Sequence, residues 1–265
     1  MQITVRDVRA FKDRGERFPM LTAYDALSAR LLDEAGIPLI LVGDTLGMVM
    51  LGYDSTVPVG MEQMLHHTAA VARGTKNALV IGDMPFMSYQ GNADEAMTNA
   101  GRFLKEAGAR AVKLEGAGRM VDLAARMTDS GIPVMGHLGL TPQSVNQLGG
   151  YRVQGRNDEQ AHRIFNDAKE LEAAGVFAVV LEAVPVTVAR EVTASLEVPT
   201  IGIGAGPHCD GQVLVWHDFL GITPDHKPKF VKRYAELGDE ITRAARSFAE
   251  EVKKGVYPDT DHSYE

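Results

Sequence analysis

Eight short apolar runs recur along the sequence, and stretches with helical periodicity separate most of them. Such runs are typical of parallel strands that are buried on both faces. We expect these strands at residues 19–23, 39–42, 78–81, 109–114, 132–135, 177–181, 199–203 and 212–215. Eight strands with intervening helices favour an α/β protein with a (β/α)8 TIM barrel fold. A doubly wound open sheet is the structural alternative, but the number of strands favours the barrel.

The spacing of apolar residues between these runs predicts the helices that surround the barrel. They lie at residues 26–35, 61–75, 93–107, 119–130, 158–174 and 187–195. Gly36 and Gly131 each follow a predicted helix, where glycine supplies a left-handed cap and releases the chain into the next strand. No linker-like or low-complexity segment interrupts the pattern, so we expect a single barrel domain over residues 1–265.

Two further helices are expected outside this repeating pattern. Residues 5–14 predict an extra N-terminal helix ahead of the first strand, able to cover the bottom of the barrel. Residues 230–252 predict one long amphipathic C-terminal helix. Its apolar face must pack on the barrel wall or on a partner.

The composition narrows the classes of partner. The chain has 35 Asp and Glu residues against 27 Lys and Arg residues, a formal net charge of −8. This balance argues against nucleic acid as a partner, since phosphate binding requires a basic surface. No apolar stretch approaches the roughly 20 residues of a membrane-spanning helix, so we expect no membrane partner. With nucleic acid and membranes excluded as partners, we expect a protein that acts on small molecules. The single cysteine, Cys209, cannot form an internal disulfide, so we expect that protein to be cytoplasmic.

Charged residues and a histidine stand at the ends of five successive apolar runs. They are Asp44, Asp83, Lys113 with Glu115, His137 and Glu182. In (β/α)8 enzymes the active site lies at the carboxyl ends of the strands. Lys113 and Glu115 are two residues apart on one strand, so both can face the barrel mouth. Carboxylate oxygens gathered at one place suit a hard cation such as Mg2+, and Glu182, farther round the barrel, is a candidate general base.

Each of these residues also has a plainer explanation when it is taken alone. A single aspartate after a strand, such as Asp44 or Asp83, is often a helix N-cap. Lys113 or Glu182 alone is compatible with an ordinary ion pair, and His137 alone is more typical of a core histidine than of a catalyst. Their coincidence at successive strand ends favours an active site.

Longer stretches of the sequence carry a resemblance to a known family. From about residue 3 to about residue 262, the chain is similar to the ketopantoate hydroxymethyltransferases, also called 3-methyl-2-oxobutanoate hydroxymethyltransferases. The strings that carry this resemblance are LTAYDALSARLLDEAGIPLILVGDTLGMVMLGYDSTVPV, DMPFMSY, AVKLEG, IPVMGHLGLTPQSVNQLGGYRVQGR and PTIGIGAGPHCDGQVLVWHD.

The resemblance implies an enzymatic function. It implies transfer of a hydroxymethyl group from 5,10-methylenetetrahydrofolate to 3-methyl-2-oxobutanoate, giving 2-dehydropantoate (ketopantoate) in the first step of pantothenate biosynthesis. It also implies Mg2+ as the cofactor, a Mg2+-stabilised enolate, and a homodecamer built from rings.

The same resemblance implies roles for individual residues. Asp44 and Asp83 are expected to bind both metal and substrate, Lys113 to bind substrate, Glu115 to bind metal, and Glu182 to accept a proton. The family usually has serine after the first metal aspartate, and Thr45 stands there in this chain. A hydroxyl is retained, so Thr45 is still expected to hydrogen-bond the substrate carboxylate, although its methyl group alters the packing.

Two other functions remain open at this point. One is a Mg2+-dependent lyase or mutase that acts on another 2-oxo acid in a similar barrel and needs no folate. A catalytic cysteine would favour that function, and Cys209 has no activating neighbours in the sequence. The other is a non-catalytic binding or assembly protein whose carboxylates merely cap helices.

Overall fold

The computed structural model describes residues 2–223 and 228–264, which divide into two compact units, Met1–Leu214 and Val215–Glu265. The first unit contains all eight strands, and the second contains the C-terminal helices. The expectation of a single domain over residues 1–265 stays a prediction.

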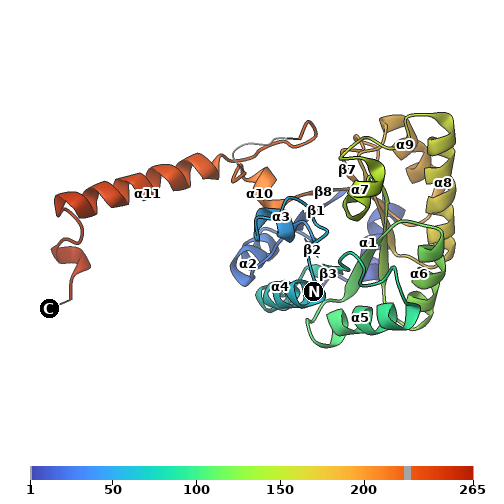
Figure 1. Ribbon diagram of the computed structural model, residues 1–265, viewed down its shortest axis with the longest axis horizontal. Coiled ribbons are helices and arrows are strands. Elements are labelled where there is room, and N and C mark those ends of the chain that lie inside the picture. The colour runs from blue at the N-terminus through green and yellow to red at the C-terminus, as the bar shows by residue number, and fades with distance from the viewer. Residues whose placement is uncertain (1, 224–227, 265) are drawn as a thin grey trace. The chain divides into compact units, whose positions relative to one another are not determined.

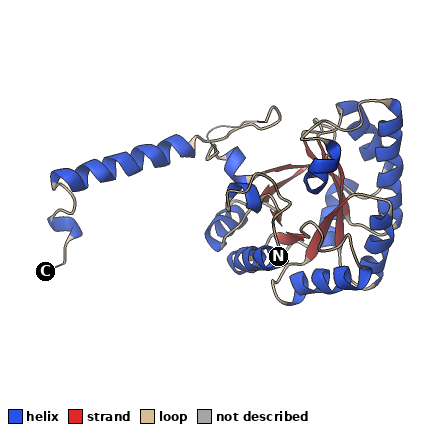
Figure 2. Cartoon of the chain, viewed as in Figure 1, coloured by secondary structure: helices blue, strands red, loops and turns tan. Residues whose placement is uncertain are grey.

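The first unit is a closed barrel of eight parallel strands in sequence order (Figures 1 and 2). The strands are β1 (Phe18–Thr22), β2 (Leu39–Val42), β3 (Leu79–Asp83), β4 (Ala111–Glu115), β5 (Val134–Gly139), β6 (Ala178–Glu182), β7 (Thr200–Ile203) and β8 (Gly211–Leu214). Closure is shown by β1, which pairs with β2 on one side and with β8 on the other. The (β/α)8 TIM barrel is therefore confirmed, and the open sheet is excluded.

Helices surround this barrel on the outside (Figure 2). They are α2 (Ala26–Glu34), α4 (Met61–Gly74), α5 (Ala93–Lys105), α6 (Arg119–Asp129), α8 (Asp158–Ala173) and α9 (Val186–Ser195). Asp25 caps α2 by accepting hydrogen bonds from the backbone N–H groups of Leu27 and Ser28. Gly36 and Gly131 adopt the expected left-handed conformation, with φ of +79° and +85°. The local signals at the helix ends thus predicted the turns correctly.

Short helices that the apolar pattern did not predict lie in the loops. They are α3 (Leu46–Val49) after β2, and η1 (Pro142–Ser144) with α7 (Val145–Leu148) after β5. Both loops leave the carboxyl ends of their strands, where a (β/α)8 barrel places its functional site.

The barrel interior is filled by alternate residues of the strands, such as Met20, Leu41 and Ile81. Helix α1 (Val5–Asp13) covers the amino-terminal end of the barrel, as expected, because Val8 is fully buried among these residues. Lys12 Nζ also donates to a carboxylate oxygen of Asp210 at 2.9 Å, which anchors α1 to the chain just before β8. The amino-terminal end is therefore closed by packing and by an ion pair.

The second unit contains α10 (Trp216–Phe219), α11 (Leu237–Lys254) and η2 (Thr260–His262). The long C-terminal helix is confirmed, but it begins at Leu237 and not at residue 230 as expected. The reason lies in the backbone, because the N–H groups of Tyr234 and Leu237 donate to the carbonyls of Phe219 and Leu220. None of the residues in α11 is buried.

Among the described residues, no helix is both long enough and apolar enough to cross a membrane.

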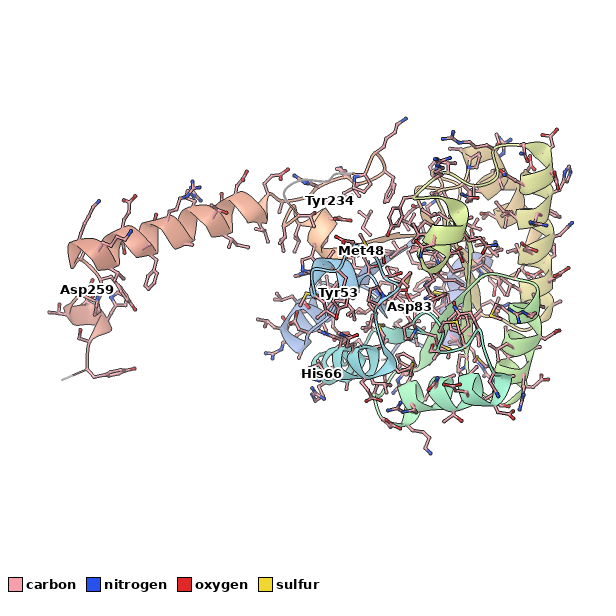
Figure 3. The ribbon with its side chains drawn as sticks, viewed as in Figure 1. Met48, Tyr53, His66, Asp83, Tyr234 and Asp259 are labelled. Carbon is pink, nitrogen blue, oxygen red and sulfur yellow. The ribbon has the colours of Figure 1, made fainter. Side chains whose placement is uncertain are left out.

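His66 is exposed on the outer helix α4, away from Asp83 inside the barrel (Figure 3).

Candidate active site

The polar residues at the carboxyl ends of the strands continue the inward-facing rows of the barrel core. Side chains alternate along a strand, so residues two apart face the same side. On β3, Asp83 lies two residues beyond Ile81, and on β6, Glu182 lies two residues beyond Val180; Ile81 and Val180 are both core residues. The same alternation brings in Lys113 and Glu115 on β4 and His137 on β5.

Lys113 lies between two carboxylates at the centre of this group. Its Nζ is 2.6 Å from Asp83 Oδ1 and 3.6 Å from Glu115 Oε1. All three residues are at most 6% exposed. The strand register explains the first contact, because Asp83 and Lys113 are direct neighbours on β3 and β4. Removing one partner of such a buried pair leaves an uncompensated charge, which is strongly destabilising.

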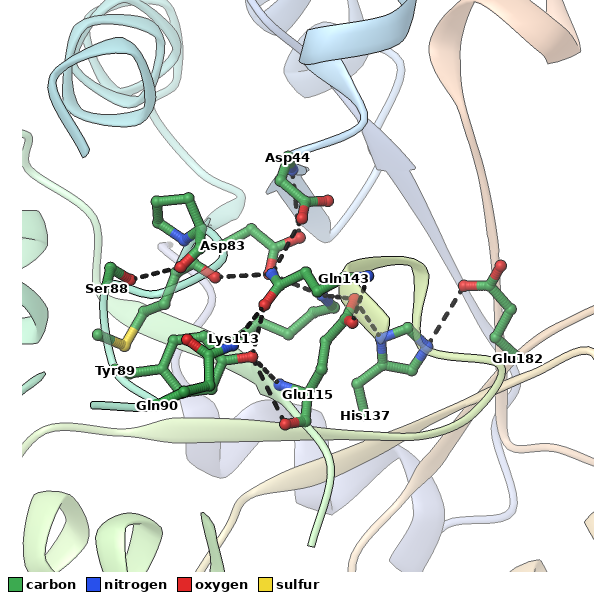
Figure 4. Close-up of polar contacts among 12 residues, drawn as sticks. Asp44, Asp83, Ser88, Tyr89, Gln90, Lys113, Glu115, His137, Gln143 and Glu182 are labelled. Carbon is green, nitrogen blue, oxygen red and sulfur yellow. Dashed lines mark hydrogen bonds and ion pairs between the residues drawn. The ribbon is translucent and has the colours of Figure 1, made fainter. Parts of the chain in front are cut away.

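Asp44 joins this group from the loop that follows β2. Its backbone N–H donates to Asp83 Oδ2 at 3.2 Å, and its own Oδ2 accepts from Gln143 Nε2 at 2.9 Å (Figure 4). Its other oxygen, Oδ1, accepts no hydrogen bond from the described residues. Thr45 comes next and precedes α3, but its hydroxyl makes no capping bond to that helix.

His137 connects two further carboxylates (Figure 4). Its Nδ1 lies 3.2 Å from Glu115 Oε1, and its Nε2 lies 3.3 Å from Glu182 Oε2. The second contact is an ion-pair distance without the alignment of a hydrogen bond. The Glu182 side chain is 17% exposed, whereas that of His137 is 2% exposed. Glu182 is therefore the member of this chain of contacts that a ligand can reach.

The titration of these groups reflects their burial and crowding. Burial, together with repulsion from Asp83 and Glu115, raises the pKa of the Asp44 carboxyl well above its usual range. Burial also raises the pKa of Asp83, against the opposing effect of Lys113. For His137, burial and Lys113 act to lower the pKa, but Glu115 and Glu182 outweigh them and raise it to about 9.

Lys113 remains protonated because carboxylates surround its ammonium group. Burial disfavours its charge, yet the surrounding carboxylates of Asp83, Glu115 and Asp44 raise its pKa. Four carboxylates, counting Glu182, therefore face two cationic side chains, Lys113 and His137. The surplus of negative charge favours a further cation at this place.

The structure brings together all the acidic and basic residues that the sequence placed at the strand ends. The sequence placed His137 in this group without giving it a role, and the structure places it between Glu115 and Glu182. Sequence reasoning missed Gln143 and Tyr89, which are both buried in this group. Tyr89 donates its hydroxyl to Gln143 Oε1 at 2.7 Å. Their loops carry no strand or helix periodicity, so the only available signal was that Tyr89 lies in the string DMPFMSY and Gln143 in the string IPVMGHLGLTPQSVNQLGGYRVQGR.

Comparison with known proteins shows which family the chain belongs to. A model of the family described as ketopantoate hydroxymethyltransferase matches residues 2–260. The chain belongs to the ketopantoate hydroxymethyltransferase family. The 3-methyl-2-oxobutanoate hydroxymethyltransferase of Thermobifida fusca (strain YX) is 59% identical over 263 residues, which cover 99% of this chain and 94% of the relative. The enzyme of that name from Syntrophus aciditrophicus (strain SB) is also 59% identical, covering 99% of this chain and 97% of the relative.

Solved structures show that other proteins share this barrel. A phosphonopyruvate hydrolase superposes with a TM-score of 0.64 at 16% identity, covering 100% of this chain and 92% of that chain. A 2,3-dimethylmalate lyase, described as a member of the PEP mutase/isocitrate lyase superfamily, superposes with a TM-score of 0.62 at 15% identity, covering 99% of this chain and 92% of that one. At this identity the likeness establishes the fold alone.

The donor set of this ketopantoate hydroxymethyltransferase family member fits a hard divalent cation. Within the described ranges, no three acidic, histidine or cysteine side chains already converge as a complete metal cage. Mg2+ does not require one, because it binds through one or two carboxylates and completes its octahedron with water and ligand oxygens. Asp44 Oδ1 accepts no hydrogen bond from the described residues and is open for such a contact, whereas both oxygens of Asp83 and both of Glu115 already accept hydrogen bonds.

Proposed function

We propose that this chain transfers a hydroxymethyl group from 5,10-methylenetetrahydrofolate to 3-methyl-2-oxobutanoate and so makes 2-dehydropantoate, the first step of pantothenate biosynthesis. The observation that carries the proposal is the identity of 54–59% to relatives named 3-methyl-2-oxobutanoate hydroxymethyltransferase, over 99% of this chain. The buried group of carboxylates, lysine and histidine at the barrel mouth supports it, because a 2-oxo acid presents a carboxylate and a keto oxygen to such a group.

In this proposal Asp44, Asp83 and Glu115 hold Mg2+, with Glu115 acting directly or through bound water. Both oxygens of Asp83 and both of Glu115 already accept hydrogen bonds, so Asp44 supplies the open carboxylate oxygen. When bound, Mg2+ supplies Lewis acidity to the keto oxygen of the substrate.

Lys113 and Thr45 bind the carboxylate end of the oxo acid. Lys113 is suited to this because neighbouring carboxylates keep its ammonium charged although it is buried. Thr45 offers a hydroxyl that is not used for capping α3. Both residues adjoin Asp44 or Asp83, so they fix the substrate where its keto oxygen meets the acidic residues.

Glu182 removes the proton from C3 of the oxo acid. It is suited to this because it is the most accessible carboxylate of the group. The C–H electrons enter the enolate and then form the new C–C bond to the one-carbon unit of the folate. The two C–N bonds that join the one-carbon unit to N5 and N10 of the folate both break, and water supplies the hydroxyl oxygen of the product. The proton from C3 and one proton of the water end on the two folate nitrogens.

Proton NMR of 3-methyl-2-oxobutanoate in D2O tests this proposal. We expect the enzyme with Mg2+ to exchange the C3 proton for deuterium, and to form ketopantoate once methylenetetrahydrofolate is added. Omission of the metal should abolish both. Exchange without transfer would point instead to a keto-acid lyase or mutase. Absence of exchange in folded, metal-loaded protein would point to a non-catalytic protein.

The assembly and the location are also proposals. We infer a ring-based homodecamer from the family resemblance and a cytoplasmic location from the single cysteine. Light scattering coupled to gel filtration tests the assembly, and a mass of one chain, 28.7 kDa, would contradict it. Cell fractionation tests the location.

A further inference from the structure

Gln143 donates hydrogen bonds to two of the carboxylates that are proposed to bind the metal, and the proposed reaction gives it no role. It lies in η1, in the loop after β5, and is 3% exposed. Its side-chain Nε2 donates to Asp44 Oδ2 and to the carbonyl oxygen of Met84, both at 2.9 Å. Its backbone N–H donates to Glu115 Oε2 at 3.1 Å (Figure 4). One residue therefore donates to the carboxylate of Asp44, from the loop after β2, and to that of Glu115, on β4.

The orientation of the Gln143 amide is set by donors on its other side. Its Oε1 accepts from the Tyr89 hydroxyl at 2.7 Å and from Gln90 Nε2 at 2.9 Å. With Gln90 Nε2 donating to Oε1, and with the Met84 carbonyl and the Asp44 carboxylate accepting from Nε2, a flipped amide would lose these three bonds. The NH2 group is therefore the end that faces Asp44.

These two donors are themselves oriented by the backbone. Gln90 Oε1 accepts from the Met87 N–H at 2.6 Å, so the NH2 group of Gln90 must face Gln143. The Tyr89 oxygen accepts from the Glu115 N–H at 3.0 Å, and of the two acceptors near its own hydrogen, Gln143 Oε1 at 2.7 Å is much closer than the Glu115 carbonyl oxygen at 3.5 Å. The direction of the amide is thus fixed by main-chain groups on two segments.

We propose that Gln143 is a positioning residue that holds Asp44 and Glu115 in place as ligands of the divalent cation. This inference rests on the proposed function, because it requires the cation site. The amide occupies Asp44 Oδ2 and leaves Oδ1 for the ion, while the backbone N–H occupies Glu115 Oε2. Gln143 touches no reacting atom.

The chemistry of an amide suits this task better than that of a cationic residue. Asp44 lies beside a second carboxylate, since its backbone N–H donates to Asp83 Oδ2 at 3.2 Å, and the Gln143 amide is the side-chain donor that holds it there. A lysine or arginine at position 143 would hold Asp44 but would also neutralise it and compete with the ion. An amide holds the carboxylate through a hydrogen bond and brings no positive charge that would compete with the cation.

Direct titration of divalent cation into the substrate-free protein tests the inference. Calorimetry with Mg2+ and electron paramagnetic resonance with Mn2+ report binding without activity. We expect Gln143→Met, which is similar in volume and lacks the amide, to weaken binding by about 10- to 100-fold. With saturating metal, kcat should return to within about threefold of the original value, because the amide acts only through the carboxylates. An unchanged cation affinity in folded Gln143→Met would overturn the inference.

Gln90→Met is the matched control, since it removes an amide that hydrogen-bonds Gln143 and does not itself contact Asp44. Tyr89 still donates to Gln143 Oε1 in that variant, so we expect less than about a threefold change in affinity. If Gln143→Met does not fold, Tyr89→Phe combined with Gln90→Met releases the amide without removing it. That pair should weaken cation binding by more than the product of the two single changes, and a merely multiplicative effect would contradict the inference.

The unmodified chain separates this inference from the proposed function. If it binds no divalent cation, or binds one without C3 proton exchange, the proposed function fails. If it binds the cation and catalyses exchange while Gln143→Met binds equally well, only the role of Gln143 fails.

Discussion

The imidazole Nε2 of His137 lies 3.3 Å from Oε2 of Glu182, across the neighbouring strands β5 and β6. The other ring nitrogen of His137 faces Glu115 at 3.2 Å. The candidate base is therefore linked through one ring to the carboxylates that are proposed to hold the metal.

Replacement of Glu182 by glutamine tests its assignment as the base. Glu182→Gln retains the size of the side chain but cannot accept the C3 proton. We expect the C3 exchange rate to fall by about 10^2- to 10^4-fold, with cation affinity unchanged within about threefold. NMR in D2O measures the first quantity and calorimetry the second. An undiminished C3 exchange rate would contradict the assignment of Glu182 as the base.

Paired replacements at Thr45 separate the hydroxyl from the methyl group. Thr45→Val is nearly isosteric and removes the hydroxyl, so we expect KM for the oxo acid to rise about 10-fold, as for loss of a hydrogen bond to a charged group. Thr45→Ser keeps the hydroxyl and should change KM by less than about threefold. Steady-state kinetics at saturating metal measure both. Equal KM values for the two variants would show that the hydroxyl does not contact the substrate.

Gly139, at the end of β5, controls the position of the Glu182 backbone. Its φ is +94°, and a Cβ at this position would lie 2.2 Å from the carbonyl oxygen of Glu182. We expect Gly139→Ala to displace Glu182, lowering kcat by about 10^2-fold and the free energy of unfolding by more than about 2 kcal/mol.

Gly131→Ala is the matched control for that prediction. Gly131 has a similar φ of +85° but has no atom within 4 Å of an added Cβ. We expect it to cost about 1–2 kcal/mol of unfolding free energy and to leave kcat unchanged. Equal effects of the two alanines on kcat would contradict the steric explanation.

The charge of His137 predicts a pH dependence of stability in the metal-free protein. Burial and Lys113 oppose the protonated ring, but Glu115 and Glu182 raise its pKa from 6.5 to about 9. Because the folded-state pKa is the higher one, this contribution is complete below pH 6.5 and is lost as the pH rises through about 9.

The His137→Gln variant isolates that contribution. We expect the difference in unfolding free energy between the unmodified protein and the variant to shrink by about 3 kcal/mol between pH 6 and pH 10. Urea denaturation in the presence of EDTA at each pH measures it. A difference that does not vary with pH would show that the ring is neutral in the folded protein.

Local patterns in the sequence predicted most of the architecture. The eight strands were found because a strand buried on both faces must be apolar throughout. The residues Asp83, Lys113, Glu115 and Glu182 were found because strand alternation and the barrel fold carry them to the same end. Where tertiary contacts replace local ones, the prediction was less accurate, and α11 begins seven residues after its expected start at residue 230.

The sequence by itself therefore determined the barrel, its family and the acidic and basic residues at its mouth, because periodicity, glycine caps and long motifs are local properties of a chain. Only the tertiary structure decided which of those residues contact one another. His137 has the same sequence neighbourhood whether it is a core residue or a link between Glu115 and Glu182. Gln143 meets Asp44 because the loop after β5 folds back over the barrel mouth, and such a contact between distant segments leaves no periodic trace in the sequence.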